Sequence, residues 1–311
     1  MLMAIVMVSA ACTSELDNEG FVGGTTEQVG SMSVKWRNYL SVEQQQVLKD
    51  IITDMVKVEG GTFMMGCSQE QDAEARNDES PVHLVRLTDF YICAHELTYL
   101  QMQTLLSVPK TRAADINAAT GKTMSSKEKN EEDLANIKKY QGERLYWTWE
   151  EWNYVLRIMQ EYTGLHFTFP TEAQWEYAAR GGNQSHGFRY PGSNRLQDVW
   201  SSALDDTNFS LPNELGLYNM ADRQGEWCLD AYAPYNDAVL QVDPCTTVGN
   251  GHVVRGGSHA GTRLTSDWES GRAYYGFVHK DQRMIRPTAR AYDSHSMYVG
   301  CRPVINIISE P

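Results

Sequence analysis

Ser258 lies in a stretch whose residue types could support nucleophilic catalysis. Residues 256–260 read Gly-Gly-Ser-His-Ala, close to the elbow that presents a nucleophilic serine at a strand–turn–helix junction. The last glycine of that motif is Ala260 here, and no strand–turn–helix pattern surrounds it. Residues 293–295 read Asp-Ser-His, but a catalytic triad is assembled in space and not by adjacency. Neither pattern predicts a hydrolase.

The cysteines offer a second kind of chemistry, based on thiols or bound metal. There are six, namely Cys12, Cys67, Cys93, Cys228, Cys245 and Cys301. No two are spaced as Cys-x-x-Cys, so a thioredoxin-like or zinc-ribbon site has no support. Cys93 and Cys228 lie in apolar runs and are predicted to be small core residues. Without Cys12 the number is odd, so at least one thiol stays unpaired in an oxidising compartment, and the pairing remains open.

Composition bounds the class of protein. A chain of 311 residues holds one large domain or two small ones, and 41% hydrophobic residues suit a packed core. The net charge of −13, with no dense basic run, argues against a nucleic-acid partner. No linker after residue 35 divides the chain.

The first residues are typical of a bacterial lipoprotein. Residues 1–11 are small and apolar, too few to span a membrane, and predict a signal peptide. The Ser-Ala-Ala before Cys12 resembles a lipoprotein cleavage box, so Cys12 is the predicted lipidation site and membrane anchor. The leader lacks a positive charge, and the alternative is a disordered N-terminus with an incidental cysteine. Residues 12–35, rich in Gly, Ser, Thr and acids, predict a flexible acidic tether.

Helix and strand signals are few. Three capping boxes predict helices, and they begin at Ser41, Thr148 and Thr171. The first helix is expected within residues 36–55, and Gly164 is expected to end the second. Residues 82–87 alternate between apolar and polar and predict a short strand. Residues 107–143 are polar and charged and predict an insertion.

Four blocks of sequence together carry a resemblance to one known family. They are 58–66 (VEGGTFMMG), 169–182 (FPTEAQWEYAARGG), 216–228 (GLYNM, then GEWC) and 255–302 (RGGS to GCR). In this order they resemble the formylglycine-generating enzyme family, also called the sulfatase-modifying-factor family. The resemblance covers residues 56–306. It implies an α+β, loop-rich fold related to C-type lectins, with few helices and short, mostly antiparallel strands.

The chemistry that the resemblance implies lacks its reactive atoms. Active members use two cysteines, placed before an Ala-Arg pair in the last block, to bind copper and oxidise a substrate cysteine with oxygen. Soft thiolates suit Cu(I). Here the matching pair ends at Arg290, Pro287 or its neighbour holds the place of the second cysteine, and no cysteine lies between Ser258 and Gly300. We therefore expect no copper and assign no catalytic residue, while Cys301 is expected in the core.

The resemblance also implies a calcium site in the third block. The matching ligands are the side chains of Asn219 and Glu226 and the carbonyls of Asp222 and Gln224. Calcium prefers hard oxygen ligands, which this set supplies. Asp222 and Gly225 depart from the family's residues, however. The alternative is a capping Asn beside a buried, paired Glu.

The last block is also rich in arginine. A binding cleft for an anionic peptide or a glycan is predicted around Ser258, Trp268, Arg286 and Arg290. The alternative is that arginines such as Arg255 and Arg302 form buried ion pairs that hold loops together.

Together these features predict a lipoprotein of the outer membrane, at the cell surface or in the periplasm. Its sulfatase-modifying-factor-like domain would act in protein or glycan binding or assembly, without formylglycine-generating activity. The acidic stretch after Cys12 resembles the surface-export tag of Bacteroidota lipoproteins. One alternative is a divergent oxidoreductase of the same family that acts on a protein or peptide and binds a redox metal. Another is a sugar binder whose platform would be lined by Trp149, Trp152, Tyr274 and Tyr275, although aromatic residues on a helix face more often belong to the core.

Overall fold

The computed structural model describes most of the chain. The described residues are 24–67, 77–106, 148–199, 211–221, 225–236, 240–256, 290–293 and 299–307. Cys12, the signal peptide and the expected insertion at 107–143 lie outside them. None of the described helices combines the length and the apolar character needed to cross a bilayer.

Five α-helices lie within the described residues: α1 (Val42–Thr53), α2 (Tyr99–Leu106), α5 (Trp149–Thr163), α6 (Glu172–Ala179) and α7 (Leu196–Val199). The three predicted capping boxes are confirmed. In each, the side chain of Ser41, Thr148 or Thr171 accepts a hydrogen bond from the backbone three residues later, and that residue's side chain accepts one in return. Gly164 ends α5 in the left-handed conformation, as expected. Two short 3-10 helices, η2 (Asn77–Glu79) and η3 (Gly182–Gln184), complete the helical elements.

The strands are short and form small sheets. One four-stranded sheet has the order β11 (Arg290–Asp293), β10 (His252–Arg255), β8 (Gly225–Ala231), β12 (Val299–Gly300). The other has the order β3 (Met55–Val58), β6 (Phe90–Cys93), β13 (Val304–Asn306), β7 (Phe167–Thr168). A third sheet joins β4 (Gly61–Met65), β5 (His83–Leu87) and β9 (Gln241–Val242). Most pairings are antiparallel, and β5 confirms the strand predicted at 82–87.

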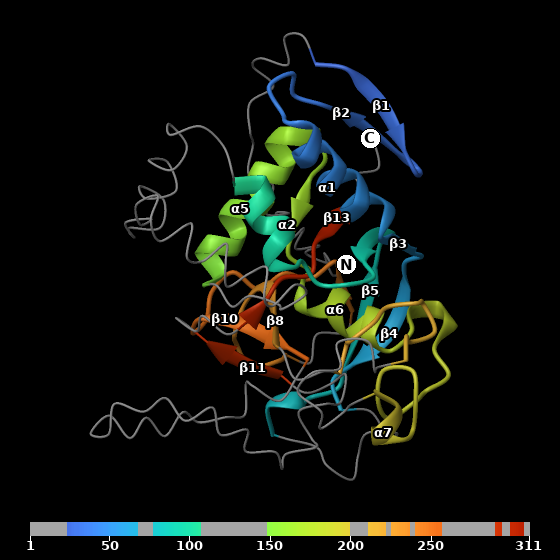
Figure 1. The fold of residues 1–311 in the computed structure, drawn as a ribbon. Helices are drawn as coiled ribbons and strands as arrows, with labels where there is room; N and C mark the ends of the chain where they lie inside the picture. The colour runs from blue at the N-terminus through green and yellow to red at the C-terminus, as the bar shows by residue number, and fades with distance from the viewer. Residues whose placement is uncertain are drawn as a thin grey trace, which may run out of the picture.

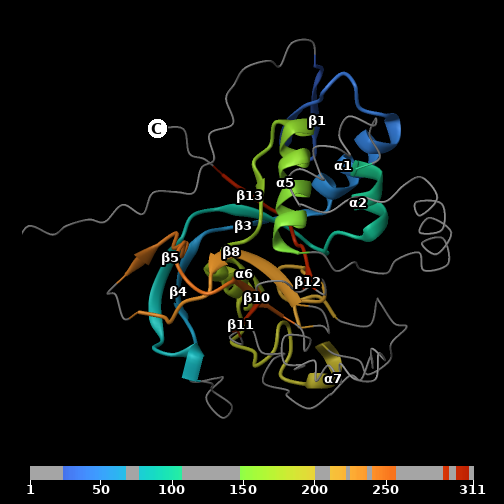
Figure 2. The same ribbon diagram turned by 90° about the vertical axis from the view of Figure 1, so that its left-hand side faces the viewer.

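The described part of the molecule has two layers that meet along α5 and β13. Helices α1, α2 and α5 lie together on one side with the strands β1 and β2, and the three larger sheets lie on the other, as the two views in Figure 1 and Figure 2 show. Helix α6 lies among the sheets and packs against β4, β5, β8 and β10. Two buried apolar clusters follow this division, one under the three helices and one around α6.

The prediction that residues 12–35 form a flexible tether is wrong for its second half. Strands β1 (Thr26–Val29) and β2 (Met32–Lys35) form an antiparallel hairpin instead. Its inward side chains Val34 and Trp36 are almost fully buried in the same core as α1 and α5. Burial of these apolar side chains offsets the conformational entropy lost by ordering a polar segment.

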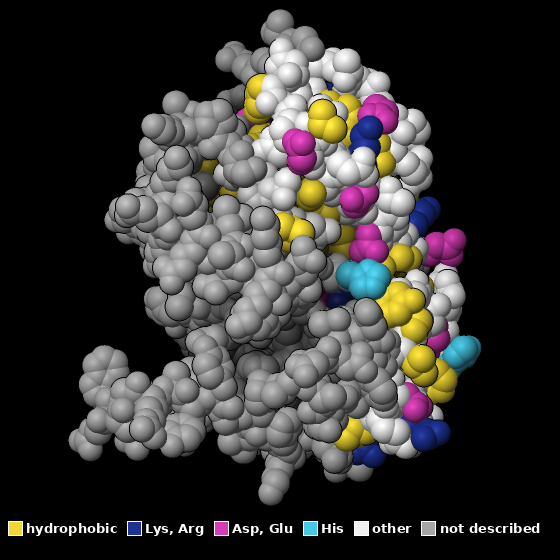
Figure 3. Space-filling view, viewed as in Figure 1, with side chains coloured by type: hydrophobic (Ala, Val, Ile, Leu, Met, Phe, Trp, Pro, Cys, Tyr) yellow, Lys and Arg dark blue, Asp and Glu magenta, His cyan; other side chains and the backbone are white. Residues whose placement is uncertain are grey.

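The surface of the described residues is mixed in charge. On the face shown in Figure 3, Lys and Arg side chains are scattered among acidic ones and do not gather into a patch. Ion pairs among the described residues include Lys57 with Asp89 at 2.8 Å and Lys49 with Glu27 at 2.8 Å.

Candidate functional site

Helix α6 supplies charged side chains to the centre of the molecule. It begins at the Thr171 capping box, and every residue from Glu172 to Ala179 is buried. The carboxylates of Glu172 and Glu176 are one helical turn apart and therefore project from the same face. Buried carboxylates need cationic or hydrogen-bonding partners, because desolvation otherwise disfavours the charge.

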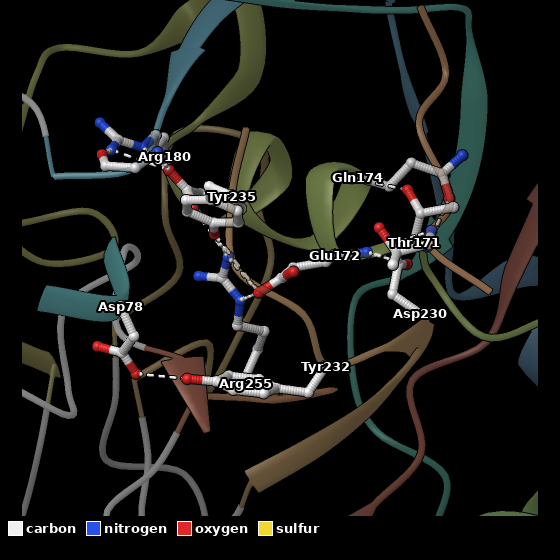
Figure 4. A network of polar contacts seen from close by, with 12 residues as sticks. Asp78, Thr171, Glu172, Gln174, Arg180, Asp230, Tyr232, Tyr235 and Arg255 are labelled. Carbon is white, nitrogen blue, oxygen red and sulfur yellow. Dashed lines mark hydrogen bonds and ion pairs between the residues drawn. The ribbon is translucent and has the colours of Figure 1, made fainter. Parts of the chain in front are cut away.

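Arg255, at the end of β10, is the cation that meets both carboxylates (Figure 4). Its Nε donates to Glu172 Oε1 at 3.0 Å, and its Nη2 donates to Glu176 Oε2 at 2.9 Å. Nη2 also donates to the hydroxyl of Tyr235 at 2.7 Å. Burial alone disfavours the guanidinium charge, but Tyr235 and the two carboxylates together raise the pKa of Arg255.

The Arg255 cluster continues to the end of β4. Oε1 of Glu176 accepts a hydrogen bond from the backbone N–H of Gly66 at 2.9 Å and one from Arg180 Nε at 3.0 Å. Arg180 Nη2 then donates to the carbonyl of Gly66 at 2.6 Å. The cluster therefore connects β10, α6 and β4 through buried, charge-assisted hydrogen bonds, which are stronger than neutral ones.

Arg302 is the centre of a second buried cluster, around β8. Its Nε and Nη2 form a bidentate pair with Glu226, with contacts from 2.6 to 3.0 Å. Nη1 donates to the carbonyls of Cys93 and Ala94, and Nη2 also donates to that of Tyr218. All five N–H donors of the guanidinium are thereby satisfied, which is what a fully buried arginine requires.

Trp175 joins the two clusters. Its indole Nε1 donates to Glu226 Oε2 at 2.7 Å, and the guanidinium of Arg255 lies 5.9 Å from the centre of a Trp175 ring. Arg255 directly precedes residues 256–260, and Arg302 closes the last family-like block. Both ends of that block are thus fixed to α6 and β8. The alternative to a binding cleft, namely that arginines of this block form buried ion pairs, is confirmed for Arg255 and Arg302.

The geometry at Glu226 does not suit the expected calcium site. Both oxygens of this carboxylate already accept hydrogen bonds from Arg302, and one also accepts from Trp175. A calcium ion there would have to displace a guanidinium cation. Glu226 is therefore a structural ion-pair partner, which was the alternative to a ligand. Asp222 and Gln224 lie outside the described residues, and a calcium role for them and for Asn219 stays a prediction.

The other predicted site residues are only partly in view. The backbone of Arg290 lies in β11, directly opposite Arg255 in the β10–β11 pair. Ser258, Trp268 and Arg286 lie outside the described residues, so the cleft predicted around them stays a prediction.

Three of the cysteines are core residues, as expected for Cys93, Cys228 and Cys301. Burial raises the pKa of each thiol well above its usual range. A metal-binding or nucleophilic thiolate is therefore strongly disfavoured at these positions.

Two of the aromatic residues weighed as a sugar platform, Trp149 and Trp152, pack inside the molecule instead. Trp149 stacks on His252 with ring centres 3.9 Å apart and on Phe169 with ring centres 5.1 Å apart. Trp152 is fully buried, and its Nε1 donates to the carbonyl of Val299 at 3.0 Å. These rings contribute to packing.

Comparison with known proteins agrees with this architecture. The family model described as a sulfatase-modifying factor enzyme 1-like domain matches residues 41–307. The formylglycine-generating enzyme of Thermomonospora curvata is 25% identical over 272 residues, which cover 68% of this chain and 84% of that enzyme. The chaperone protein LppX of Paenibacillus barcinonensis is 27% identical over 216 residues, covering 56% of this chain and 70% of LppX.

A larger relative contains a similar region. Serine/threonine-protein kinase Pkn1 of Chlamydia trachomatis is 26% identical over 240 residues, which cover 70% of this chain but only 35% of Pkn1. The chain thus spans about a third of the length of that kinase.

Two solved structures share the fold. Treponema denticola variable protein 1 aligns with a TM-score of 0.55 and 17% identity, covering 92% of this chain and 99% of that one. PvdO from Pseudomonas aeruginosa aligns with a TM-score of 0.54 and 17% identity, covering 81% of this chain and 94% of that one. At this identity the likeness establishes the fold alone.

Proposed function

The chain belongs to the sulfatase-modifying factor enzyme 1-like family, and from this premise we propose that it is a binding or assembly protein without formylglycine-generating activity. One observation carries the proposal. No cysteine lies between Ser258 and Gly300, where the copper-binding pair of the active enzymes would stand. The cysteine next to that stretch, Cys301, is fully buried, and burial raises its pKa. A thiolate pair for copper therefore has no source in this part of the sequence.

The charged residues of the described core support a structural role for the family-like blocks. The carboxylates of Glu172, Glu176 and Glu226 are all committed to Arg255 or Arg302. Each of these carboxylates is buried against its arginine and is not exposed to a ligand in the described structure. These ion pairs connect elements of the fold whether or not the chain has oxidase activity.

A protein ligand is favoured over a glycan. Trp149 and Trp152, the described aromatic residues suggested for a sugar platform, are taken up by packing. The relative named as a chaperone supports a role in handling another protein. We place this function at the outer membrane, with the chain anchored through a lipid on Cys12.

The decisive experiment is a peptide oxidation assay. The purified full chain is incubated with a sulfatase-type cysteine peptide, copper and oxygen, beside an active formylglycine-generating enzyme. We expect no aldehyde product and no near-stoichiometric copper in the protein. Product formation would overturn the proposal in favour of the divergent oxidoreductase.

A matched pair of variants locates any activity that does appear. Cys67 and Cys245 are the described cysteines that reach the surface in part. Product that disappears in Cys67→Ser or Cys245→Ser would identify a displaced thiol site. A glycan array completes the test. Selective binding to one class of sugar would show that the ligand is a glycan and not a protein.

A further inference from the structure

The β4–β5–β9 sheet has one face in the core and one face in solvent. On the inner face, Met65, Val85 and Leu87 are buried in the cluster around α6. Phe63 packs there against Tyr177 of α6, with ring centres 5.1 Å apart. Successive side chains of a strand alternate between the two faces, so the residues between these point outward. In Figure 2, β4 and β5 lie at the margin of the molecule, away from α1, α2 and α5.

Six outward side chains form what we call the β4–β9 patch: Thr62, Met64, Leu84, Arg86, Leu240 and Val242. The register places Met64 opposite Leu84 on β5, and Arg86 opposite Val242 on β9. Leu240 directly precedes β9 and is two residues before Val242, so it shares this face. The patch is therefore continuous across three strands.

The patch is apolar although it faces solvent. Met64 is 46% exposed, Leu240 is 40% exposed and Val242 is 42% exposed, and Leu84 between them is partly exposed. A solvated sheet face normally carries polar side chains in alternation with the buried ones. A contiguous exposed apolar surface of this kind is typical of an interaction site.

Arg86 is the only charged residue of the patch. It is exposed and lies between Thr62 and Val242 on the neighbouring strands. Its guanidinium forms no ion pair or hydrogen bond with another of the described side chains. Asp243, the acid that follows Val242, accepts instead from the backbone N–H of Thr88 at 2.8 Å. A partner that covers the patch must supply a carboxylate, because an unpaired charge under an apolar surface is costly.

The dimensions of the patch suit one α-helix. Neighbouring strands lie about 4.8 Å apart, so three strands make a face about 10 Å wide, and a helix with its side chains is about 10–12 Å across. The row of side chains through Leu84 and the row through Arg86 are two residues, or about 7 Å, apart. One helical turn rises about 5.4 Å, so successive turns of a helix along the strands meet successive rows.

We propose that the β4–β9 patch docks an amphipathic helix of another protein, which combines an apolar stripe with one acidic residue. The stripe covers Met64, Leu84 and Leu240, and the carboxylate one turn away pairs with Arg86. The proposal goes beyond the absence of oxidase activity and does not depend on it, because no patch residue belongs to the last family-like block.

Two other occupants fit the patch less well. Two copies of this chain, related by a two-fold axis through the patch centre, would bring their Arg86 side chains together, and like charges repel. An anionic membrane would meet one cation in the patch, on a chain whose net charge is −13. A helix from another protein avoids both conflicts.

The test selects binders of the purified full chain from a phage-displayed library of helical peptides of about 18 residues, a length that supports a helix in water. The apolar stripe is fixed and the flanking positions are randomised. We expect enriched peptides to carry Asp or Glu one turn from the stripe, and to bind Arg86→Glu about tenfold more weakly or worse. Exchange of that acid for Lys should restore binding to Arg86→Glu, which damage to the fold would not do. No enrichment, or binding that ignores Arg86→Glu, overturns the proposal.

Two matched pairs of variants locate the binding. Val242→Glu should abolish it, whereas Val42→Glu, at a valine on α1 that is 79% exposed, should not change it. Arg157→Glu is the control for Arg86→Glu, since Arg157 is exposed on α5. Equal losses of affinity in both members of a pair would place the binding elsewhere and refute the patch.

The other occupants are tested on the full chain with Cys12→Ser, which excludes a lipid anchor. Its mass in sedimentation should be the same with and without Val242→Glu, and vesicles of phosphatidylglycerol should retain neither form. A dimer, or vesicle binding, that disappears in Val242→Glu would assign the patch to a second copy or to a membrane and overturn the proposal.

Discussion

The indole Nε1 of Trp175 donates a 2.7 Å hydrogen bond to Oε2 of Glu226, and this contact unites the two buried ion-pair clusters of the molecule. Trp175 lies between Glu172 and Glu176 on α6, which bind Arg255, while Glu226 binds Arg302. A single short helix therefore takes part in fixing both boundary residues of the last family-like block. The predictions below follow from this arrangement and from the groups around it.

Loss of Arg302 should severely destabilise the protein. Arg302→Met leaves the Glu226 carboxylate buried without its cation and removes the guanidinium donor from three carbonyls, of which that of Ala94 keeps the backbone N–H of Tyr218. Breaking a buried pair in this way costs about 3–5 kcal/mol, which urea unfolding would measure. Lys57→Met is the control, since its pair with Asp89 is exposed and screened by solvent and should contribute far less to stability than the buried pair. Similar losses of unfolding free energy in the two variants would show that the buried cluster stabilises the protein no more than an exposed ion pair does.

Gly256 should tolerate no side chain. Its φ of +68° is left-handed, and an added Cβ would lie 2.9 Å from Cζ2 of Trp175. Gly256→Ala should therefore lower the free energy of unfolding by about 1–2 kcal/mol for the left-handed backbone, and by a further amount for displacing the indole. Gly30→Ala isolates the backbone part, because Gly30 has a φ of +56° and open space around it. Equal losses of unfolding free energy in the two variants would contradict the steric contribution of Trp175.

Stability should fall as the pH rises toward neutrality. The pKa of Asp230 is raised from 3.8 to about 7 by burial and by Glu172, so the folded state retains a proton that the unfolded chain releases. This stabilisation is complete below the ordinary pKa and is lost as the pH rises through the folded one, with a slope of at most about 1.4 kcal/mol per pH unit. Urea unfolding at about pH 5 and about pH 8 should show a smaller difference in Asp230→Asn than in the wild type. The same difference in both proteins would exclude Asp230 as its source.

The core thiols should resist alkylation in the native state. Cys93, Cys228 and Cys301 are buried, and burial raises the pKa of each. Iodoacetamide at neutral pH, followed by peptide mass mapping, should leave all three unmodified until the protein is unfolded. Rapid labelling of Cys301 in the folded protein would reopen the question of a reactive thiol beside the last block.

Cys12 should determine where the protein resides. Expressed with its own leader in a bacterium that processes lipoproteins, the wild-type chain should carry acyl groups and sediment with membranes. Cys12→Ser should abolish both the added lipid mass and the membrane association, because the lipid is the proposed link. Unchanged membrane association of the variant would point to another anchor.

Local signals in the sequence predicted the helices well. Each capping box at Ser41, Thr148 and Thr171 involves residues three positions apart, and all three form as expected. Such hydrogen bonds depend only on neighbouring residues, so they can be inferred without knowing the tertiary structure.

The β1–β2 hairpin could not be recognised in the same way. Its composition is that of a linker, and only Val29, Met32, Val34 and Trp36 are buried. Their partners belong to helices far along the chain, including Leu48 on α1 and Val155 on α5. Ordering of this segment is a tertiary effect that a local pattern does not contain.

The candidate site was predictable in its residue types but not in its pairings. Arginines in the last block suggested buried ion pairs, and Arg255 and Arg302 form them. The partners of Arg255, however, are Glu172 and Glu176, which are 83 and 79 positions away. The only sequence signal for these partners was the pair of glutamates one helical turn apart in a largely apolar block. Glu226 matched a calcium ligand in type, yet its geometry is decided by Arg302.

The packed β1–β2 hairpin also limits how far the domain can lie from a membrane in which Cys12 is anchored. The described residues begin at Gly24, twelve peptide steps after Cys12, which is proposed to carry the lipid. Even fully stretched, these steps span at most roughly 40 Å, about half of what a tether reaching to residue 35 would allow. A domain anchored through so short a segment would stay in the layer next to the lipid headgroups. A partner would have to come within that distance of the membrane to bind it.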